Sequence, residues 1–310
     1  MDVLEGKSIF LWNVPSVANG DPQQIATLLH NAGFQTVIVK GGSGNAVYVP
    51  PIFPFAKWNK KPNITPELIQ ALHNVGIKVA GFGFCYGIDP VGEGSVAAKL
   101  LTNLDLDAWV WDVEDSFESF LNNNSDTGFQ HAQLLIQSYL TNKTRSVPTA
   151  FCSWARWHDP NPKLNRPWHN EKMGGLFMAF CDYGMPMCYW SRLGPDNKPI
   201  KPLPVDATNL LTEAIKQWAP ITDKTLIPVG RAFTGTGGIA TGPAAAAFDT
   251  LARANHMRGV SWWGLDWAKS LPDVWGVLNG LSSAYEAALP TIPSTSDPSQ
   301  AANEQQSGSG

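Results

Sequence analysis

Residues 77–114 read IKVAGFGFCYGIDPVGEGSVAAKLLTNLDLDAWVWDVE, and this stretch decides the fold. The apolar run over 77–85 predicts a strand, the spacing of apolar residues over 94–104 predicts a helix, and 108–114 predicts a second strand. A strand, a helix and a strand in close succession form a βαβ unit, whose two strands run parallel in one sheet.

The same alternation extends outward from this stretch over most of the chain. Strands are predicted at 8–14, 35–40, 77–85, 108–114, 149–154, 184–190, 225–231 and 259–265. Helices are predicted at 21–33, 65–76, 94–104, 127–141, 173–181, 206–217, 243–255 and 276–288. Eight such alternations in a chain of 310 residues predict an α/β protein with a single (β/α)8 TIM barrel over residues 1–289.

A doubly wound open sheet is the alternative fold, but it usually places a Gly-rich turn directly after the first strand. The first predicted strand is followed instead by the sequence WNVPS at 12–16. Pro186 lies inside the sixth predicted strand and suggests a bulge there, because proline cannot donate to a sheet ladder. Residues 290–310 are rich in Pro, Ser, Gln and Gly and predict a flexible, disordered C-terminal tail.

The composition excludes several classes of protein. With 44% hydrophobic and only 15% charged residues, the chain is neither disordered nor a coiled coil. The 22 basic and 26 acidic side chains give a net charge of −4, which argues against a nucleic-acid binder. The 13 Trp residues indicate an aromatic surface that sugars could occupy.

The ends of the chain and the cysteines bear on its location. The N-terminus lacks the basic and apolar segments of a signal peptide, and no run of residues is long and apolar enough for a membrane span. Cys85, Cys152, Cys181 and Cys188 form no CxxC pair, so reduced and mostly buried thiols are expected. These features predict synthesis in the cytoplasm. The final location stays open, since parts of phage-like particles leave cells without signal peptides.

The active site of such a barrel lies at the carboxyl ends of its strands. Asp112 and Glu114 close the fourth strand two residues apart, so both point toward the barrel mouth. Two carboxylates this close raise one pKa, which suits a general acid. Aromatic and basic residues at the other strand ends are the candidate substrate-binding residues: Trp12, Lys40, Tyr86, Trp111, Trp154, Tyr189, Arg231 and Trp263.

The seventh strand carries Arg231 and no acid, although a retaining mechanism with two separated carboxylates would need one there. A mechanism built on the fourth strand alone fits better. In it the 2-acetamido group of the substrate attacks, Asp112 orients that group, and Glu114 protonates the leaving group.

Residues 107–114, DAWVWDVE, resemble the DxxDxDxE motif of family 18 chitinases, with Asp107, Asp112 and Glu114 on matching positions and Val110 in place of the middle Asp. The segment around Tyr189 is similar to the sixth strand of that family, where a Tyr helps to hold the acetamido group. The segment ending at Trp263 resembles its eighth-strand Trp segment, which implies that Trp263 floors a sugar subsite. The Asp-x-Glu pair also looks like that of family 25 lysozymes, which cleave peptidoglycan.

Weaker patterns suggest other chemistry. Lys40 could form a Schiff base, although a lysine without an evident partner is more often a member of an ion pair or a hydrogen-bond donor to substrate. His158, Asp159 and His169 could join the carboxylates in a metal site, but no metal-binding motif supports this, and neither metal nor cofactor is expected. The Gly-rich segments 41–44 and 234–238 could bind an anion, but they match no P-loop.

Two functional hypotheses follow. The first is a glycoside hydrolase that cleaves a β-linked, N-acetylated glycan such as peptidoglycan or chitin, as a phage-related lysin would. The second is a barrel that binds glycan without turnover or serves a structural role, for example in a phage tail or injection system, with the tail as a tether. Val110 and the tail favour the second hypothesis, while the intact Asp112–Glu114 pair favours the first.

Overall fold

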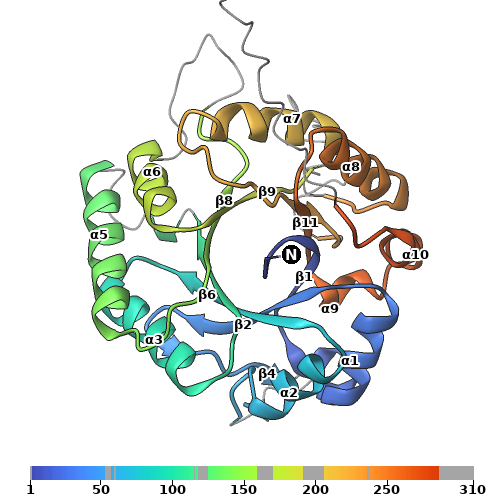
Figure 1. The fold of residues 1–310 in the computed structure, drawn as a ribbon, viewed down its shortest axis with the longest axis horizontal. Coiled ribbons are helices and arrows are strands. Elements are labelled where there is room, and N and C mark those ends of the chain that lie inside the picture. Colours follow the sequence, from blue (N-terminus) through green and yellow to red (C-terminus); the bar gives the residue numbers. More distant parts are fainter. Residues whose placement is uncertain are drawn as a thin grey trace, which may run out of the picture.

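The computed structural model describes residues 2–52, 57–58, 61–114, 116–117, 125–158, 170–190, 206–235 and 238–285. Its main sheet is a closed barrel of eight parallel strands, because the first strand pairs with both the second and the last (Figure 1). The eight strands are β1 (Gly6–Leu11), β2 (Thr36–Ser43), β6 (Lys78–Cys85), β7 (Ala108–Val113), β8 (Thr149–Trp154), β9 (Tyr183–Cys188), β10 (Val229–Arg231) and β11 (Gly259–Trp263). The predicted TIM barrel is therefore confirmed.

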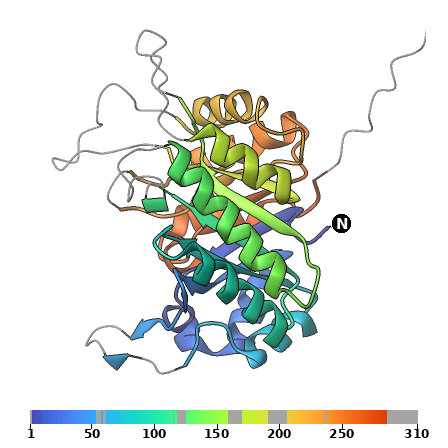
Figure 2. The same ribbon diagram turned by 90° about the vertical axis from the view of Figure 1, so that its left-hand side faces the viewer.

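Helices cover the outside of this barrel (Figures 1 and 2). They are α1 (Pro22–Asn31), α2 (Pro66–Asn74), α3 (Pro90–Asn103), α5 (Ser125–Asn142), α6 (Glu171–Phe180), α7 (Ala207–Trp218), α8 (Gly242–Ala254), α9 (Leu265–Ala268) and α10 (Pro272–Gly280). Two 3-10 turns, η1 (Val14–Ser16) and η2 (Ala18–Gly20), follow β1. Short strands add β3 (Ala46–Val47) to the edge of β2 and pair β4 (Pro51–Ile52) with β5 (Lys57–Trp58).

Three predicted boundaries were wrong. The helix predicted at 94–104 begins at Pro90, because the side chain of Asp89 caps it by accepting from the Gly92 N–H. The strand predicted at 225–231 is regular only over β10, and only an isolated bridge pairs its earlier part with β9. The last helix lies at 272–280 rather than 276–288, and residues 286–310, which include the predicted tail, lie outside the described residues.

Side chains alternate between the barrel interior and the helix layer along each strand. On β7, Val110 belongs to the interior cluster, whereas Trp109 and Trp111 belong to the cluster between strands and helices. Glycines on the neighbouring strand β6 make room for these large rings. A Cβ on Gly81 would lie 2.6 Å from the ring of Trp109, and one on Gly83 would lie 2.9 Å from it. The two faces of β7 therefore hold apolar packing outside and the candidate chemistry inside.

Pro186 lies in β9 without the expected bulge, since the register with β8 is continuous through its pair with Ser153. The reason is the direction of its nitrogen. Gly184 donates its N–H to the Thr225 carbonyl on the β10 side, so alternation turns the Pro186 nitrogen to that side as well. Regular pairing of β9 with β10 starts only at Met187. Pro186, which has no N–H to donate, therefore lies just before the paired residues and costs the sheet no hydrogen bond.

Two buried residues stabilise the amino end of the barrel, Leu4 in its interior and Lys7 between β1 and the helix layer. Leu4 is fully buried and belongs to the interior cluster. Lys7 on β1 is also fully buried, and its ammonium donates to the carbonyls of Ala32, Leu278 and Leu281. These carbonyls lie at the C-terminal ends of α1 and α10, where a cation is favoured by the helix dipoles. One side chain thus joins the first strand to the first and last helices.

Candidate active site

The carboxyl ends of the strands bring most of the predicted site residues to the interior face of the barrel. Four aromatic side chains pack there against the interior cluster: Trp12 from β1, Trp154 from β8, Tyr189 after β9 and Trp263 from β11. Lys40 and Arg231 follow interior residues of β2 and β10 by two positions and are buried, with exposed fractions of 7% and 3%. The site is therefore assembled from six strands, and its carboxylates come from a seventh, β7.

The carboxyl pair has one buried and one more accessible member. Asp112 is 2% exposed, and its Oδ1 has no hydrogen-bond partner in the described part of the chain. Glu114 is half-buried at the rim. Burial raises the pKa of Asp112 well above its usual range, and the charge of Glu114 raises it further, while Lys40 acts in the opposite direction. The raised pKa of Asp112 favours a proton on this buried carboxyl, next to the more accessible Glu114.

Tyr189, a candidate substrate-binding residue, lies close enough to this pair for the charges of Asp112 and Glu114 to act on its hydroxyl. Burial raises the pKa of its hydroxyl, and the charges of Asp112 and Glu114 add to the effect, so the hydroxyl keeps its proton and can donate a hydrogen bond. The guanidinium of Arg231 lies 6.0 Å from the centroid of the Tyr189 ring and 4.3 Å from that of Phe233. The seventh strand of the barrel therefore supplies a cation to the site, where a separated carboxylate nucleophile would otherwise stand.

Lys40 occupies the end of β2, where the register with β6 shifts between Lys40 and Gly42. Its ammonium lies over three aromatic faces, at 4.6 Å from the ring centroid of Tyr48, 5.5 Å from that of Trp12 and 5.7 Å from that of Phe84. Burial lowers the pKa of Lys40, and the two carboxyl groups of β7 oppose this shift. Lys40 is thus a buried cation with aromatic neighbours that faces the carboxyl pair.

The position of Trp12 depends on residues after β11. Asp266 accepts hydrogen bonds from the backbone N–H groups of Trp12 and Asn13, both at 2.8 Å, and from the Ser16 hydroxyl at 2.7 Å. The Trp12 ring stacks on Trp267, with a centroid separation of 5.8 Å and an interplanar angle of 16°. The carboxylate of Asp266 therefore fixes the loop after β1, and both of its oxygens are used in these structural hydrogen bonds.

The prediction that Trp111 lines the site was wrong. Trp111 is 1% exposed in the outer cluster, and its ring meets that of Tyr139 on α5 edge-on at 5.3 Å. Because Asp112 points into the barrel, strand alternation turns Trp111 to the helix layer. Tyr86 lies nearer to the site, with its ring 4.7 Å from that of Phe84 and its hydroxyl 3.4 Å from Ser43 Oγ.

Three aromatic residues near the site were missed by the substrate-binding prediction: Tyr48, Phe233 and Trp267. Trp267 and Phe233 follow the last two strands, so their place just after a strand end was a usable signal. Tyr48 lies after β3, in a segment without a strand or helix pattern, and no sequence signal placed it near Lys40.

The weaker predictions find little support. Gly41 and Gly42 are buried in or beside the ladder of β2, and Gly235 and Gly238 bond to one another through their backbone groups, so these N–H groups do not converge on an anion. No cluster of three metal-ligating side chains occurs among the described residues, while Asp159 and His169 lie outside them.

Trp157 is a packing anchor rather than a sugar-binding surface. It is fully buried against Trp218 and Phe151, with ring centroids 5.4 and 6.1 Å away. Gly174 on α6 leaves space for the ring, since a Cβ there would lie 2.7 Å from it.

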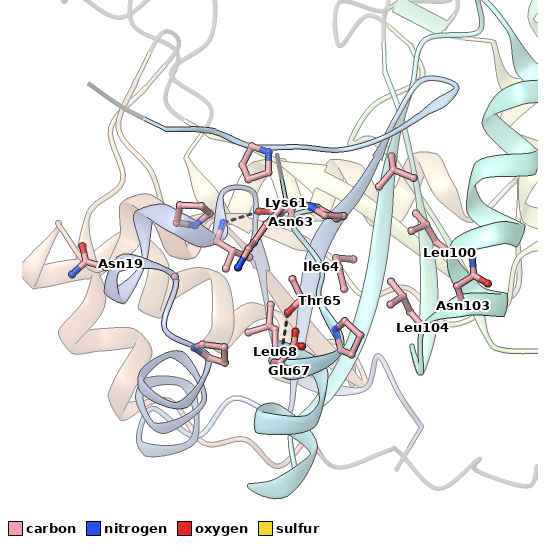
Figure 3. Close-up of a pocket in the computed structure, with 18 residues that line it drawn as sticks. Asn19, Lys61, Asn63, Ile64, Thr65, Glu67, Leu68, Leu100, Asn103 and Leu104 are labelled. Carbon is pink, nitrogen blue, oxygen red and sulfur yellow. Dashed lines mark hydrogen bonds between the residues drawn. The ribbon is translucent and has the colours of Figure 1, made fainter. Parts of the chain in front are cut away.

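A cavity of about 1080 Å³ lies on the outside of the barrel, between the start of α1, the start of α2 and the end of α3 (Figure 3). Its wall is mostly apolar and proline-rich. Two of its polar side chains have local partners, since Asn63 accepts from the Val14 N–H and Thr65 caps α2 by accepting from the Leu68 N–H. None of the predicted site residues lines this cavity, so it is separate from the carboxyl pair.

None of the helices in the described ranges has both the length and the hydropathy that crossing a membrane requires.

No family model matches the chain, and no curated protein matches its sequence. Solved structures do match. A GH18 chitinase from Pseudoalteromonas aurantia superposes with a TM-score of 0.61 at 12% identity, over 89% of this chain and 100% of the chitinase. An endo-1,4-β-D-mannanase from Thermotoga petrophila gives 0.61 at 10% identity, over 84% of this chain and 88% of the mannanase.

A xylanase and α-amylase inhibitor protein from Scadoxus multiflorus gives a TM-score of 0.54 at 12% identity, over 90% of this chain and 99% of the inhibitor. The fold that the chain shares with these solved structures is the TIM barrel. Within that class the chain is similar to barrels named as chitinases, mannanases and inhibitors, at sequence identities that show the shared fold alone.

Proposed function

We propose that the protein is a glycoside hydrolase that cleaves a β-linked glycan containing N-acetylated sugars, such as peptidoglycan or chitin. One observation carries the proposal: Asp112 and Glu114 leave β7 on the interior face, with the buried Asp112 at a raised pKa and Glu114 at the rim. A buried carboxyl coupled to an accessible one is the arrangement that general acid catalysis needs near neutral pH.

The absence of a second carboxylate from the seventh barrel strand supports a substrate-assisted mechanism. The interior position at the end of β10 is Arg231, and Asp266 after β11 already accepts three hydrogen bonds from the loop after β1. In the proposed step the proton held by Asp112 passes to Glu114, which gives it to the leaving oxygen, while the carbonyl oxygen of the substrate 2-acetamido group attacks the anomeric carbon. Asp112, now a carboxylate, accepts a hydrogen bond from the acetamido N–H.

In the second step Glu114 takes a proton from water, which opens the cyclic intermediate and returns the acid for another turnover. In this proposal the protonated hydroxyl of Tyr189 holds the acetamido carbonyl, and Trp263 and Trp12 bind the apolar faces of the sugar rings, which their packing at the interior cluster supports. The shared fold with a protein named as a GH18 chitinase supports the proposal of a glycan substrate.

The test compares the wild type with Glu114→Gln on purified peptidoglycan and on chitin oligosaccharides, with new reducing ends measured by mass spectrometry. Gln keeps the size of Glu and removes the transferable proton, so we expect release to fall by about 10²- to 10⁴-fold. Glu67→Gln on α2, which is exposed and remote from the pair, is the matched control and should release at the wild-type rate. Equal release by wild type and Glu114→Gln would show that the acid lies elsewhere.

A second candidate function is a barrel that binds glycan, or serves as part of a phage-tail or injection-system assembly, without turnover. The observation that favours it is Val110, which is fully buried in the interior cluster two residues before Asp112. An apolar side chain there removes the carboxyl relay that the resemblance to family 18 chitinases implies. The similar fold of a xylanase and α-amylase inhibitor protein is in keeping with this candidate. Detectable oligosaccharide binding with no release by the wild type would favour it.

A further inference from the structure

The ammonium of Lys40 makes no hydrogen bond and no close ion pair within the described part of the chain. Its near neighbours are the faces of three aromatic rings, and an aromatic face attracts a cation without replacing the directed hydrogen bonds that the ammonium makes in water. Lys7 shows what a buried lysine with a structural role looks like in the same molecule, because its ammonium donates to three carbonyl oxygens. Lys40 therefore retains donors for an oxygen that the chain does not supply.

The charges around Lys40 favour an anionic oxygen. The ionisable groups that act most strongly on it are Asp112 and Glu114. Burial and the charge of Glu114 both raise the pKa of Asp112, which favours its neutral form and weakens its attraction for Lys40, and Arg231 is a second buried cation at the strand ends.

A charge-assisted hydrogen bond from a largely desolvated ammonium to a carboxylate is stronger than one to a sugar hydroxyl. The aromatic rings of Trp12, Tyr48 and Phe84 also restrict the ammonium to one region, so a ligand loses little free energy in ordering it. A neutral glycan would offer this ammonium only hydroxyl and carbonyl oxygens as acceptors.

We propose that Lys40 binds a carboxylate carried by a sugar of the substrate, so that the site selects an acidic N-acetylated glycan over a neutral one. The inference rests on the proposed function, since it assumes that a glycan occupies the carboxyl ends of the strands. The carboxylate has two chemical sources, the lactyl ether of a muramic acid residue or the 6-carboxylate of a uronic acid residue.

The test measures oligosaccharide binding by calorimetry with the full chain. The acidic ligand is a fragment of alternating N-acetylglucosamine and N-acetylmuramic acid, and its neutral partner is the same fragment with the lactyl carboxylates converted to methyl esters. A fragment of alternating N-acetylglucosamine and glucuronic acid distinguishes the second source, and a chitin oligosaccharide of equal length is the neutral reference. We expect the wild type to bind one acidic fragment about ten-fold more tightly than either neutral ligand.

Lys40→Met should bring the acidic and neutral ligands to the same affinity, whereas Lys40→Arg should keep part of the preference. Lys99→Met on α3, an exposed lysine, controls for the loss of a charge and should bind as the wild type does. Wild-type affinity for both acidic fragments no greater than for the ester and the chitin oligosaccharide would overturn the inference even if Lys40→Met failed to fold. The inference would also be overturned if a folded Lys40→Met lost the same affinity for the acidic ligand as for the neutral one.

Two outcomes separate this inference from the function on which it rests. Release of reducing ends by the wild type without any preference for acidic ligands would leave the glycosidase standing and remove the role of Lys40. A wild type that neither binds nor cleaves any of these glycans would overturn the proposed function and the inference with it.

Discussion

Lys7 lies at the amino end of the barrel on β1, and Lys40 lies at the carboxyl end on β2. Both side chains are buried, and burial lowers the pKa of each. Their surroundings differ in the partners that they provide. Three carbonyls from the ends of α1 and α10 accept from Lys7, while aromatic faces and a pair of coupled carboxyl groups surround Lys40.

This difference indicates that the amino end of the barrel has a structural role and the carboxyl end a functional one. The amino end satisfies its buried charge internally, which fixes the closure of the barrel. The carboxyl end holds two buried cations and a buried carboxyl whose Oδ1 has no partner among the described residues. Such groups lower the stability of the fold and are found where binding or catalysis requires them. Three predictions test this contrast.

The largest effect is expected at the amino end. Lys7→Met keeps the apolar stem and leaves the carbonyls of Ala32, Leu278 and Leu281 without their donor in a buried place. We expect the free energy of unfolding to fall by about 4 kcal/mol, because breaking a buried charged interaction strands its partners. Urea unfolding at pH 7 measures this, with Lys99→Met as the control for charge. A loss below about 1 kcal/mol would contradict the structural role of Lys7.

A second prediction uses the pH dependence of the same residue. Burial lowers the pKa of Lys7 from 10.5 to about 8, with Asp249 on α8 opposing the shift and Arg253 adding to it. Between these two pH values the unfolded chain binds the proton and the folded chain does not, so this group makes unfolding less favourable as pH rises. The gain is at most about 3 kcal/mol, since the carbonyl acceptors favour the charged form.

Other groups act in the opposite direction in this range. Cys181 and Cys188 have raised pKa values through burial, so their titration lowers stability at high pH. The measurement is therefore the difference in unfolding free energy between wild type and Lys7→Met, which should widen from pH 7.5 to 10.5. A difference that is constant across this range would show that Lys7 keeps an ordinary pKa.

The contrast between the two ends also explains what the sequence could predict. Short apolar runs, separated by segments with helical spacing, predicted the eight strands, because the burial of a strand shows in its local sequence. The carboxyl pair was predictable for the same reason, since residues two apart on a strand share a face. That rule also turns Trp111 away from the site, but the prediction counted it as a site residue because it precedes Asp112.

The rest depended on barrel closure, which no local pattern encodes. Asp266 bonds to the N–H of Trp12, a residue 254 positions earlier, and Tyr48 reaches Lys40 from a segment without periodicity. Similarly, nothing in the sequence around Lys7 distinguished it from a solvent-exposed strand lysine, because its three acceptors come from the ends of two distant helices. Contacts of this kind join residues that are far apart in the sequence, so the partners of each buried charge become known only from the three-dimensional structure.

The smallest effect on stability is expected at the carboxyl end and has the opposite sign. Asp112→Asn removes a buried ionisable group and keeps its shape. Because the pKa of Asp112 is raised in the folded state, the folded chain binds more protons than the unfolded chain, and the wild type loses stability as pH rises from about 4 toward 7. The variant avoids this loss, so it should be more stable by about 1 kcal/mol at pH 7 and equal to the wild type near pH 4.

The same variant should lose activity by about 100-fold, since the acetamido group is then held by an amide instead of a carboxylate. Asp223→Asn, an exposed change of the same charge, should alter neither quantity. Urea unfolding at three pH values and release of reducing ends measure both effects on one set of proteins. If Asp112→Asn is less stable than the wild type at pH 7, Asp112 has a structural role, as Lys7 does. Gain of stability with loss of turnover would show that the carboxyl end maintains its charges at the expense of the fold.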